Sequence, residues 1–345
     1  MKKLFPIFSL LIFLSCNENK KDENKNKETA VDIATLVDSS SNEVKTGGIK
    51  MIQVDGKYNV WTKKIGNGAI KVLLLHGGPA FTHDYFECFE SFLPPAGMEI
   101  YYYDQLGCGY SDIPTDTSLW TLPRYVEEVE QVRKGLGLEQ FYILGHSWGS
   151  LLAMEYLQKY QSHVKAAVLS NMTAGIQSYL AYLNQLKQKF FTPAVMKTFD
   201  SLDNLKKYDA PEYQEILMKN LYTHVACQLD PWPEPIMRIF KKANMAIYAQ
   251  MQGVDEFHVT GNLKNWEIWD RLKNITVPTL VLGGMNDEMN PEDMKREGKL
   301  IPKSRTYLCP NGSHFAMYDD QRNYFINLIS FLEDVNYNQF IPDPK

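Results

Sequence analysis

Gly145-His146-Ser147-Trp148-Gly149 is the stretch that decides the fold of this chain of 345 residues. Residues 141–144 before it form a short apolar run typical of a buried strand, and residues 150–160 after it are typical of a helix. A G-x-S-x-G pattern between a strand and a helix is a nucleophile elbow, in which small residues let the backbone turn sharply and lift the serine oxygen above the sheet. The pattern therefore predicts a nucleophile at Ser147.

Short β-rich runs alternate with helical patterns outward from this elbow. Most of the runs after the first two are largely apolar, as expected of parallel strands that are covered on both faces. Strands are expected at 49–54, 58–62, 71–75, 99–103, 141–144, 165–170, 279–282 and 305–308, and helices at 122–135, 150–160 and 291–299. This alternation predicts an α/β fold with a mostly parallel central sheet.

One long stretch breaks the alternation. Residues 171–261 show helical patterns and no convincing strand. A helical insertion in an α/β sheet is expected to lie over the carboxyl ends of the strands, where such sheets bind ligands. The sequence therefore predicts a first part of the core at 47–170, an all-helical cap at 171–261 and a second part of the core at 262–345.

A serine hydroxyl needs a base to take its proton, and the base needs an acceptor that holds its tautomer. In hydrolases with a nucleophile elbow the chain order is serine, acid, histidine. Asp287 follows the expected strand 279–282, and His314 follows the expected strand 305–308. Both positions are at carboxyl ends of strands, so the sequence predicts a triad of Ser147, Asp287 and His314. Glu288 and Asp293 are rivals for the acid, but Glu288 is adjacent to Asp287 and Asp293 lies inside a helix pattern.

An oxyanion hole is expected beside the serine. His76-Gly77-Gly78-Pro79 follows the expected strand 71–75 and can offer a backbone N–H, which we assign to Gly78. The N–H of Trp148, directly after the nucleophile, is the second expected donor.

Together these motifs resemble the proline iminopeptidase family of α/β-hydrolases, and most closely its branch of tricorn-interacting aminopeptidases. The resemblance covers roughly residues 48–332. The motifs that carry it are His76-Gly77-Gly78-Pro79, Asp104-Gln105-Leu106-Gly107-Cys108-Gly109-Tyr110-Ser111, Gly145-His146-Ser147-Trp148-Gly149, Asp287 and Gly312-Ser313-His314. The resemblance implies an α/β-hydrolase fold and a serine aminopeptidase that releases an N-terminal residue, often proline, through an acyl-enzyme. Ala80, Leu106, His146 and Ser150 depart from the family pattern without removing a catalytic atom.

The resemblance also implies a pair of amine-binding glutamates in the cap. Glu234, in Trp232-Pro233-Glu234-Pro235, and Glu256 have the spacing of that pair. A desolvated ammonium is costly unless it is paired with a carboxylate. Without the resemblance, each glutamate is expected to be an ordinary solvated residue of the cap.

The first residues are expected to direct export. Lys2 and Lys3 precede a mostly apolar stretch, residues 4–15, that is too short to span a bilayer and is typical of a signal peptide. Leu14-Ser15-Cys16 resembles the cleavage box of bacterial lipoproteins, so we expect residues 1–15 to be a signal peptide and Cys16 to carry a lipid. Residues 16–46 are expected to form a disordered tether, because 17–28 contain only Asn, Glu, Lys and Asp. The alternative is secretion with an incidental cysteine. The expected location is a bacterial cell envelope, on the periplasmic or surface side.

The composition limits the kinds of partner and cofactor that are expected. Acidic residues outnumber basic ones, 41 to 36, so a nucleic-acid partner is disfavoured. Cys88, Cys108, Cys227 and Cys309 lack metal-ligand spacing and are expected to be free buried thiols, and neither a metal nor an organic cofactor is implied. The expected substrates are short peptides with a free N-terminus. The alternatives are a capped esterase or amidase for uncharged small molecules, and a binding lipoprotein on a decayed hydrolase scaffold.

Overall fold

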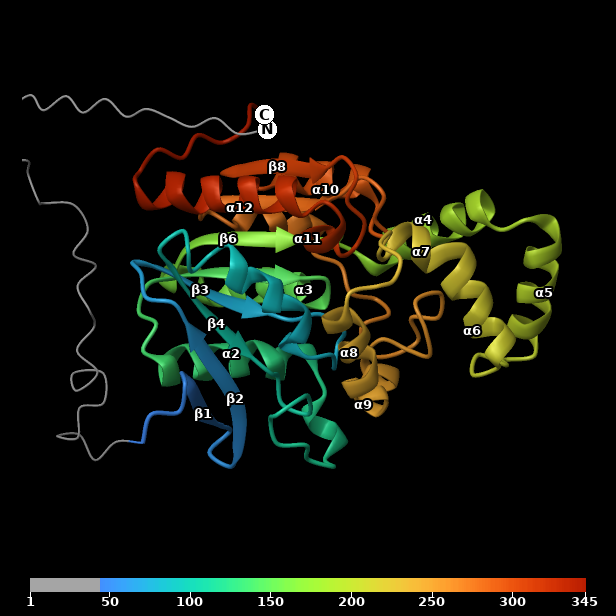
Figure 1. The fold of residues 1–345 in the computed structure, drawn as a ribbon, viewed down its shortest axis with the longest axis horizontal. Coiled ribbons are helices and arrows are strands. Elements are labelled where there is room, and N and C mark those ends of the chain that lie inside the picture. The colour runs from blue at the N-terminus through green and yellow to red at the C-terminus, as the bar shows by residue number, and fades with distance from the viewer. Residues whose placement is uncertain (1–43) are drawn as a thin grey trace, which may run out of the picture. The chain divides into compact units, whose positions relative to one another are not determined.

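The computed structural model describes residues 44–345, in which one sheet runs through the core of the folded unit Thr46–Lys345 (Figure 1). The expected signal peptide, Cys16 and nearly all of the expected tether lie outside the described residues. The strands are β1 Ile49–Val54, β2 Tyr58–Ile65, β3 Ile70–Leu75, β4 Met98–Tyr103, β5 Phe141–His146, β6 Val164–Ser170, β7 Thr279–Gly284 and β8 Ser304–Cys309.

These eight strands of the described chain have the order β1-β2-β4-β3-β5-β6-β7-β8. The pairs β1–β2 and β2–β4 are antiparallel, whereas β3 pairs in parallel with β4 and β5, and β5 through β8 pair in parallel. The sheet is therefore mostly parallel, as the apolar runs predict. Every expected strand is present, and most are longer than expected by one to three residues.

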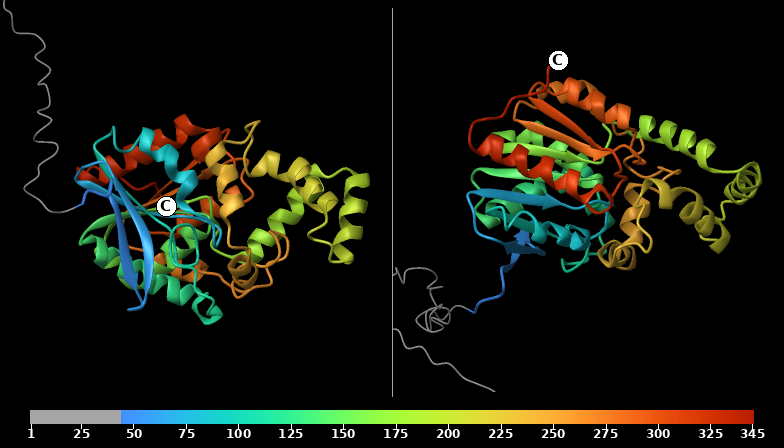
Figure 2. Two further views of the ribbon diagram at one scale, coloured as in Figure 1. Left: turned by 60° about the horizontal axis from the view of Figure 1, so that its bottom comes forward. Right: turned by 45° about the horizontal axis from the view of Figure 1, so that its top comes forward.

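Helices cover both faces of the sheet, as the two views of Figure 2 show. The core helices are η1 His83–Ser91, η2 Thr117–Leu119, α2 Leu122–Leu136, α3 Trp148–Tyr160, η3 Gln161–His163, η5 Trp269–Asn274, α10 Pro291–Leu300, α11 Ala316–Asp319 and α12 Gln321–Asn336. Alternate residues of β3 face opposite sides: Leu73 and Leu75 pack in the cluster that includes α2 and α3, and Val72 and Leu74 in the cluster that includes η1 and α12. This two-sided burial is the physical reason for the continuous apolar runs in the sequence.

The cap is a helical insertion between β6 and β7. It comprises α4 Ile176–Phe190, α5 Pro193–Asn204, α6 Pro211–Leu217, the π-helix η4 Met218–Tyr222, α7 Thr223–Val225, α8 Glu234–Lys242 and α9 Met245–Met251. Figure 1 shows these helices beyond the carboxyl ends of the parallel strands. The insertion therefore lies over the edge of the sheet at which the chemistry-bearing loops emerge.

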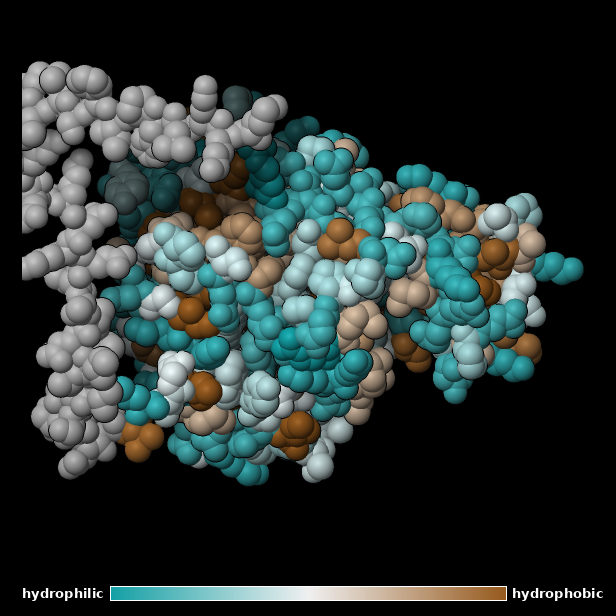
Figure 3. Space-filling model, viewed as in Figure 1, coloured by the Kyte–Doolittle hydropathy of each residue, from teal (hydrophilic) through white to brown (hydrophobic). Residues whose placement is uncertain are grey.

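The surface of the folded unit is mixed. Hydrophilic residues predominate on the face drawn in Figure 3, with apolar residues interspersed. No helix within residues 44–345 is both long and apolar enough to cross a membrane. The four cysteines at positions 88, 108, 227 and 309 are free thiols.

Gly149→Ala is expected to destabilise the fold strongly. A Cβ at Gly149 would lie 1.9 Å from the carbonyl oxygen of Leu75 in β3, so the strand and the helix would have to separate. We expect a loss at or beyond the upper end of the about 1–3 kcal/mol that overpacking costs, measured as the free energy of unfolding in urea. Gly137→Ala is the control, because its Cβ would meet nothing within 4 Å and only its left-handed φ of +68° opposes the change. A variant at Gly149 as stable as the one at Gly137 would contradict this account.

Candidate active site

Ser147 stands alone between β5 and α3, at φ 55° and ψ −127°. A non-glycine residue with positive φ is uncommon and persists only where its surroundings hold it. Here the glycines on either side allow the close approach: a Cβ at Gly145 would lie 2.1 Å from the carbonyl oxygen of Gly149. The local sequence thus produces the sharp turn, and Ser147 lines a cavity at this edge of the sheet, which we call the main cavity.

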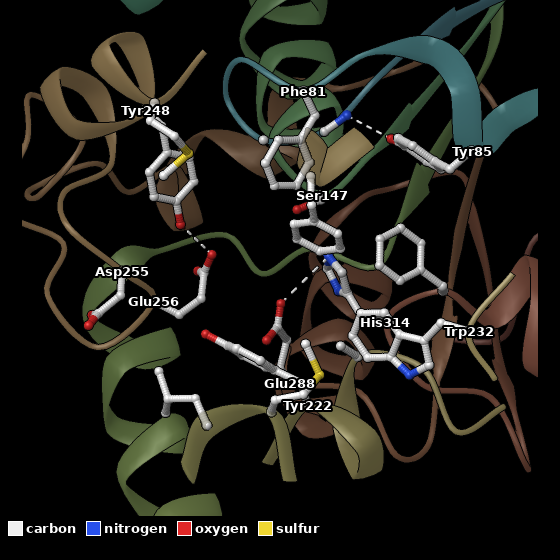
Figure 4. A pocket seen from close by; sticks show the side chains of 18 of the residues that line it. Phe81, Tyr85, Ser147, Tyr222, Trp232, Tyr248, Asp255, Glu256, Glu288 and His314 are labelled. Atoms are coloured by element: carbon white, nitrogen blue, oxygen red, sulfur yellow. Dashed lines mark hydrogen bonds and ion pairs between the residues drawn. The ribbon is translucent and has the colours of Figure 1, made fainter. Parts of the chain in front are cut away.

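Asp287 and His314 come together from the loops after β7 and β8. His314 Nδ1 lies 2.9 Å from Asp287 Oδ1. The same carboxylate accepts hydrogen bonds from the side chain of Asn171 at 2.7 Å and from the backbone N–H of Met289 at 3.0 Å. Because this carboxylate only accepts hydrogen bonds, Nδ1 of His314 carries a proton. Nε2 is the ring nitrogen left to act on the cavity side. Figure 4 shows that imidazole directed towards the region of Ser147, and both residues line the same cavity.

Three acidic residues, Asp255, Glu256 and Glu288, line this cavity, and the carboxylates of Glu256 and Glu288 extend into it. Glu288 Oε1 lies 3.7 Å from Nε2 of His314. Glu256, from the cap, accepts hydrogen bonds from the hydroxyls of Tyr248 at 2.5 Å and Tyr179 at 2.6 Å, and from the amide of Gln252 at 3.2 Å. Figure 4 shows Glu256 and Glu288 extending towards the same space.

The neighbouring negative charges shift the pKa values of His314 and Glu288. Burial lowers the pKa of His314, but the carboxylates of Asp287 and Glu288 more than compensate and raise it to about 9. Burial raises the pKa of Glu288, and the neighbouring carboxylates of Glu256 and Asp287 raise it further. A cation in this space would relieve the repulsion between the carboxylates.

The two expected oxyanion donors both lie beside Ser147. Gly78 lines the main cavity, and Gly78 and Trp148 together line a smaller space on another side of the serine. The N–H of Gly77 is already engaged, because it donates to the hydroxyl of Tyr85 at 2.7 Å. The N–H of Trp148 belongs to the first residue of α3, where helical geometry provides no intrahelical acceptor. These constraints favour Gly78 and Trp148 as the donors.

A chain of hydrogen bonds connects the oxyanion loop to the histidine. His146 Nε2 lies 2.8 Å from the carbonyl oxygen of His314, which can only accept, so Nε2 carries the proton. His146 Nδ1 therefore accepts from the hydroxyl of Tyr85 at 3.1 Å, and that hydroxyl accepts from Gly77. Burial lowers the pKa of His146 well below its usual range, which agrees with a neutral ring. Sequence analysis noted His146 only as a departure from the family pattern and did not find Tyr85, because nothing in the pattern of η1 distinguishes that tyrosine.

Glu234 is not brought to the cavity. It begins α8, its side chain is 67% exposed, and Arg238 binds it one turn later in the same helix. The structure instead places Glu288 beside Glu256. Sequence reasoning considered Glu288 only as a substitute for Asp287. Its position directly after the acid was the available signal, because an adjacent residue at a tight turn can point into the same site.

The main cavity has a volume of about 240 Å³ and is enclosed by core and cap together. Its floor includes Ser147 and His314, and its cap side includes Tyr222, Trp232, Phe240 and Met245. A cavity with a few convergent polar groups in an apolar lining is typical of a small-molecule or peptide site.

One cluster elsewhere has the composition of a metal site. Within the described part of the chain, His83, Asp84 and Glu87 have ligand atoms within 4.8 Å of one another. Arg238 lies 2.8 Å from Asp84 Oδ1 and 2.6 Å from Glu87 Oε1. Lys242 also lies 2.8 Å from Asp84 Oδ1. Protein cations thus already neutralise these carboxylates, which makes the cluster an anchor for α8.

Comparison with known proteins agrees with this geometry. The α/β-hydrolase fold family matches residues 71–321, which confirms the expected fold class. A proline iminopeptidase of Flavobacterium johnsoniae is 47% identical over 284 residues, covering 81% of this chain and 96% of that protein. One from Elizabethkingia meningoseptica is 45% identical, covering 83% and 97%. The crystal structure of proline iminopeptidase from Mycobacterium smegmatis superposes with a TM-score of 0.78 at 25% identity, covering 84% of this chain and 99% of the other.

Tyr85→Phe is expected to cost about 1–3 kcal/mol of stability, because it leaves the N–H of Gly77 and Nδ1 of His146 without partners in a buried place. Urea unfolding followed by fluorescence measures the loss. Tyr142→Phe is the matched control, since the buried hydroxyl of Tyr142 has no hydrogen-bond partner within residues 44–345, and we expect it to be neutral or slightly stabilising. Equal losses in both variants would show that the chain through His146 contributes nothing.

Proposed function

The chain belongs to the proline iminopeptidase family of α/β-hydrolases, and from this premise we propose that it is a serine aminopeptidase that releases an N-terminal proline from short peptides. The carboxylates of Glu256, which is partly buried, and Glu288, which is buried, line the same cavity as Ser147 and carry the proposal. A prolyl N-terminus is a secondary ammonium with two N–H groups, and two carboxylates can accept both. One carboxylate about 4 Å from the ammonium contributes roughly 4 kcal/mol at an effective dielectric constant near 20.

In the proposed mechanism, Ser147 Oγ attacks the carbonyl of the first residue while His314 Nε2 takes its proton. Asp287 orients the imidazole and stabilises its charged form. The N–H groups of Gly78 and Trp148 bind the oxyanion, and such a donor typically contributes about 10²–10³ in rate. His314 then protonates the leaving nitrogen, and water hydrolyses the prolyl ester on Ser147.

The bound amine also makes His314 able to act as a base. In the free site, the carboxylates favour the protonated form of His314, which cannot accept a proton. A substrate ammonium between Glu256 and Glu288 places a positive charge near the ring and lowers its pKa, so that Nε2 becomes available. Binding of the correct substrate end and activation of Ser147 are thereby coupled.

We further propose export and anchoring of the protein through Cys16. The sequence of residues 1–16, with its lysines and apolar stretch, supports this step. Membership of the tricorn-interacting branch stays a prediction.

The experiment that tests the function uses prolyl-p-nitroanilide with and without an N-acetyl group. We expect turnover of the free amine only, and none by Ser147→Ala. A capped esterase or amidase would cleave the acetylated compound as well, and an unreactive binding protein would cleave neither.

Glu256→Gln and Glu288→Gln are each expected to lower kcat/KM for prolyl-p-nitroanilide by about a hundredfold or more, because each removes one charge that pairs with the ammonium. Glu234→Gln is the matched control. Its carboxylate is exposed and binds Arg238, so kcat/KM should change by less than about twofold. A large loss of kcat/KM in Glu234→Gln, with none in Glu256→Gln and Glu288→Gln, would instead place the amine-binding site at Glu234 on α8.

The rate of labelling by a fluorophosphonate, which carries no amine, should rise with pH through about 9, the raised pKa of His314. Below that pH the imidazole is protonated and cannot take the serine proton. Glu288→Gln removes a negative charge 3.7 Å from Nε2, which destabilises the imidazolium, so the rise should move to lower pH. A rate that does not depend on pH, or a move to higher pH, would contradict the assignment of His314 as the base.

A further inference from the structure

Three aromatic side chains form a continuous wall in the main cavity. Phe81 follows the oxyanion loop, Trp232 precedes α8, and Phe240 lies on α8. The ring centroids of Phe81 and Phe240 are 5.4 Å apart, and those of Trp232 and Phe240 are 6.1 Å apart. Segments of both core and cap thus build one apolar surface, which we call the aromatic wall.

The chemistry of the cleavage fixes the direction of the substrate relative to this wall. If the amine binds at Glu256 and Glu288, the scissile carbonyl lies at Ser147. The leaving nitrogen must then take a proton from His314. Figure 4 shows Trp232 on the far side of His314 from Glu256, with Phe81 close to Ser147. The residue after the scissile bond therefore lies against the aromatic wall.

The wall is apolar and reaches solvent. Phe240 is 46% exposed and Met245, which lines the same mouth, is 54% exposed. Figure 3 shows apolar residues over α8 and α9, where the cap meets the core. Apolar surface gathered at the mouth of a cavity is typical of a binding surface. The acidic side chains that line the cavity are Asp255, Glu256 and Glu288, which would repel an acidic second residue.

The wall is also held in place before substrate arrives. Arg238 and Lys242, both on α8, bind Asp84 on η1 of the core, at 2.8 Å each. Lys242 Nζ lies 4.9 Å above the ring of Tyr110, a second contact between α8 and the core. A preformed apolar surface gives discrimination without a cost for ordering it.

We propose that the aromatic wall is the subsite for the second residue of the substrate and selects a bulky apolar or aromatic side chain there. The proposal rests on the proposed aminopeptidase function. The preferred substrates are accordingly short peptides in which the N-terminal proline is followed by Phe, Tyr, Trp, Leu or Met. Peptides with Gly or Asp as the second residue are poor substrates.

The test compares kcat/KM for Pro-Phe, Pro-Gly, Pro-Asp and prolinamide, which has no second side chain. We expect Pro-Phe to exceed Pro-Gly by roughly tenfold or more, with Pro-Asp the poorest, because a pocket contact of this size discriminates to about that degree. Phe240→Ala and Trp232→Ala should each reduce the preference for Pro-Phe over Pro-Gly several-fold. Met237→Ala, at a half-exposed position on the same helix that does not line the cavity, should leave the preference unchanged.

The failures of the two proposals are distinguishable. If prolinamide is turned over but Pro-Phe and Pro-Gly are cleaved equally well, the subsite proposal is overturned and the aminopeptidase remains. The same holds if Phe240→Ala and Met237→Ala behave alike. If no compound with a free prolyl amine is cleaved, the proposed function itself fails.

Discussion

The repulsion among the carboxylates of Asp287, Glu256 and Glu288 is the constraint on which the site depends. Asp287 is compensated by hydrogen bonds from Asn171, Met289 and His314. Glu256 receives two tyrosine hydroxyls and an amide, which solvate its charge but do not neutralise it. Within residues 44–345, the one ion-pair partner of Glu288 is the imidazole of His314, at 3.7 Å, which is too far for a hydrogen bond. The free site therefore has an excess of negative charge that the ammonium of a substrate can neutralise. Binding of the amine and lowering of the pKa of His314 thus follow from the same interaction.

The position of Ser147 depends on close backbone contacts at Gly145 and Gly149, where a side chain would collide with neighbouring backbone atoms. The elbow brings α3 against the end of β3, and the loop after β3 carries the oxyanion donors. Tyr85 and His146 tie that loop to the carbonyl of His314. The N–H of His314 in turn donates to the carbonyl of Val225 in the cap at 2.9 Å. Oxyanion loop, base and cap are thus held by one set of directional bonds, so a displacement of any one is resisted by the other two.

Sequence reasoning predicted the sheet because burial on two faces leaves a readable apolar run at each strand. It placed strand ends less well: β5 continues through Gly145 and His146 up to the serine, and neither residue looks like a strand residue by composition. Chain order predicted Ser147, Asp287 and His314; the structure places Ser147 and His314 in one cavity, with Asp287 buried behind His314 and hydrogen-bonded to it. Glu288 and Tyr85 were not, since what defines each is a partner far away in sequence. Glu234 shows the reverse: a suggestive spacing, but a helix position at which the side chain meets Arg238 and solvent.

The placement of Glu256 illustrates how the cap serves the chemistry at a distance. Its neighbour Asp255 accepts from the hydroxyl of Tyr213 at 2.7 Å and pairs with His258 at 2.7 Å. His258 also lies 2.9 Å from Asp203 at the end of α5, and Asp255 together with Asp203 outweighs burial and raises the pKa of His258. The imidazole of His258, between two aspartates, ties the loop 253–258 to the helical hairpin of the cap. Because that loop is fixed on its outer side, Glu256 can point inward without a cationic partner, which is the condition that amine recognition requires.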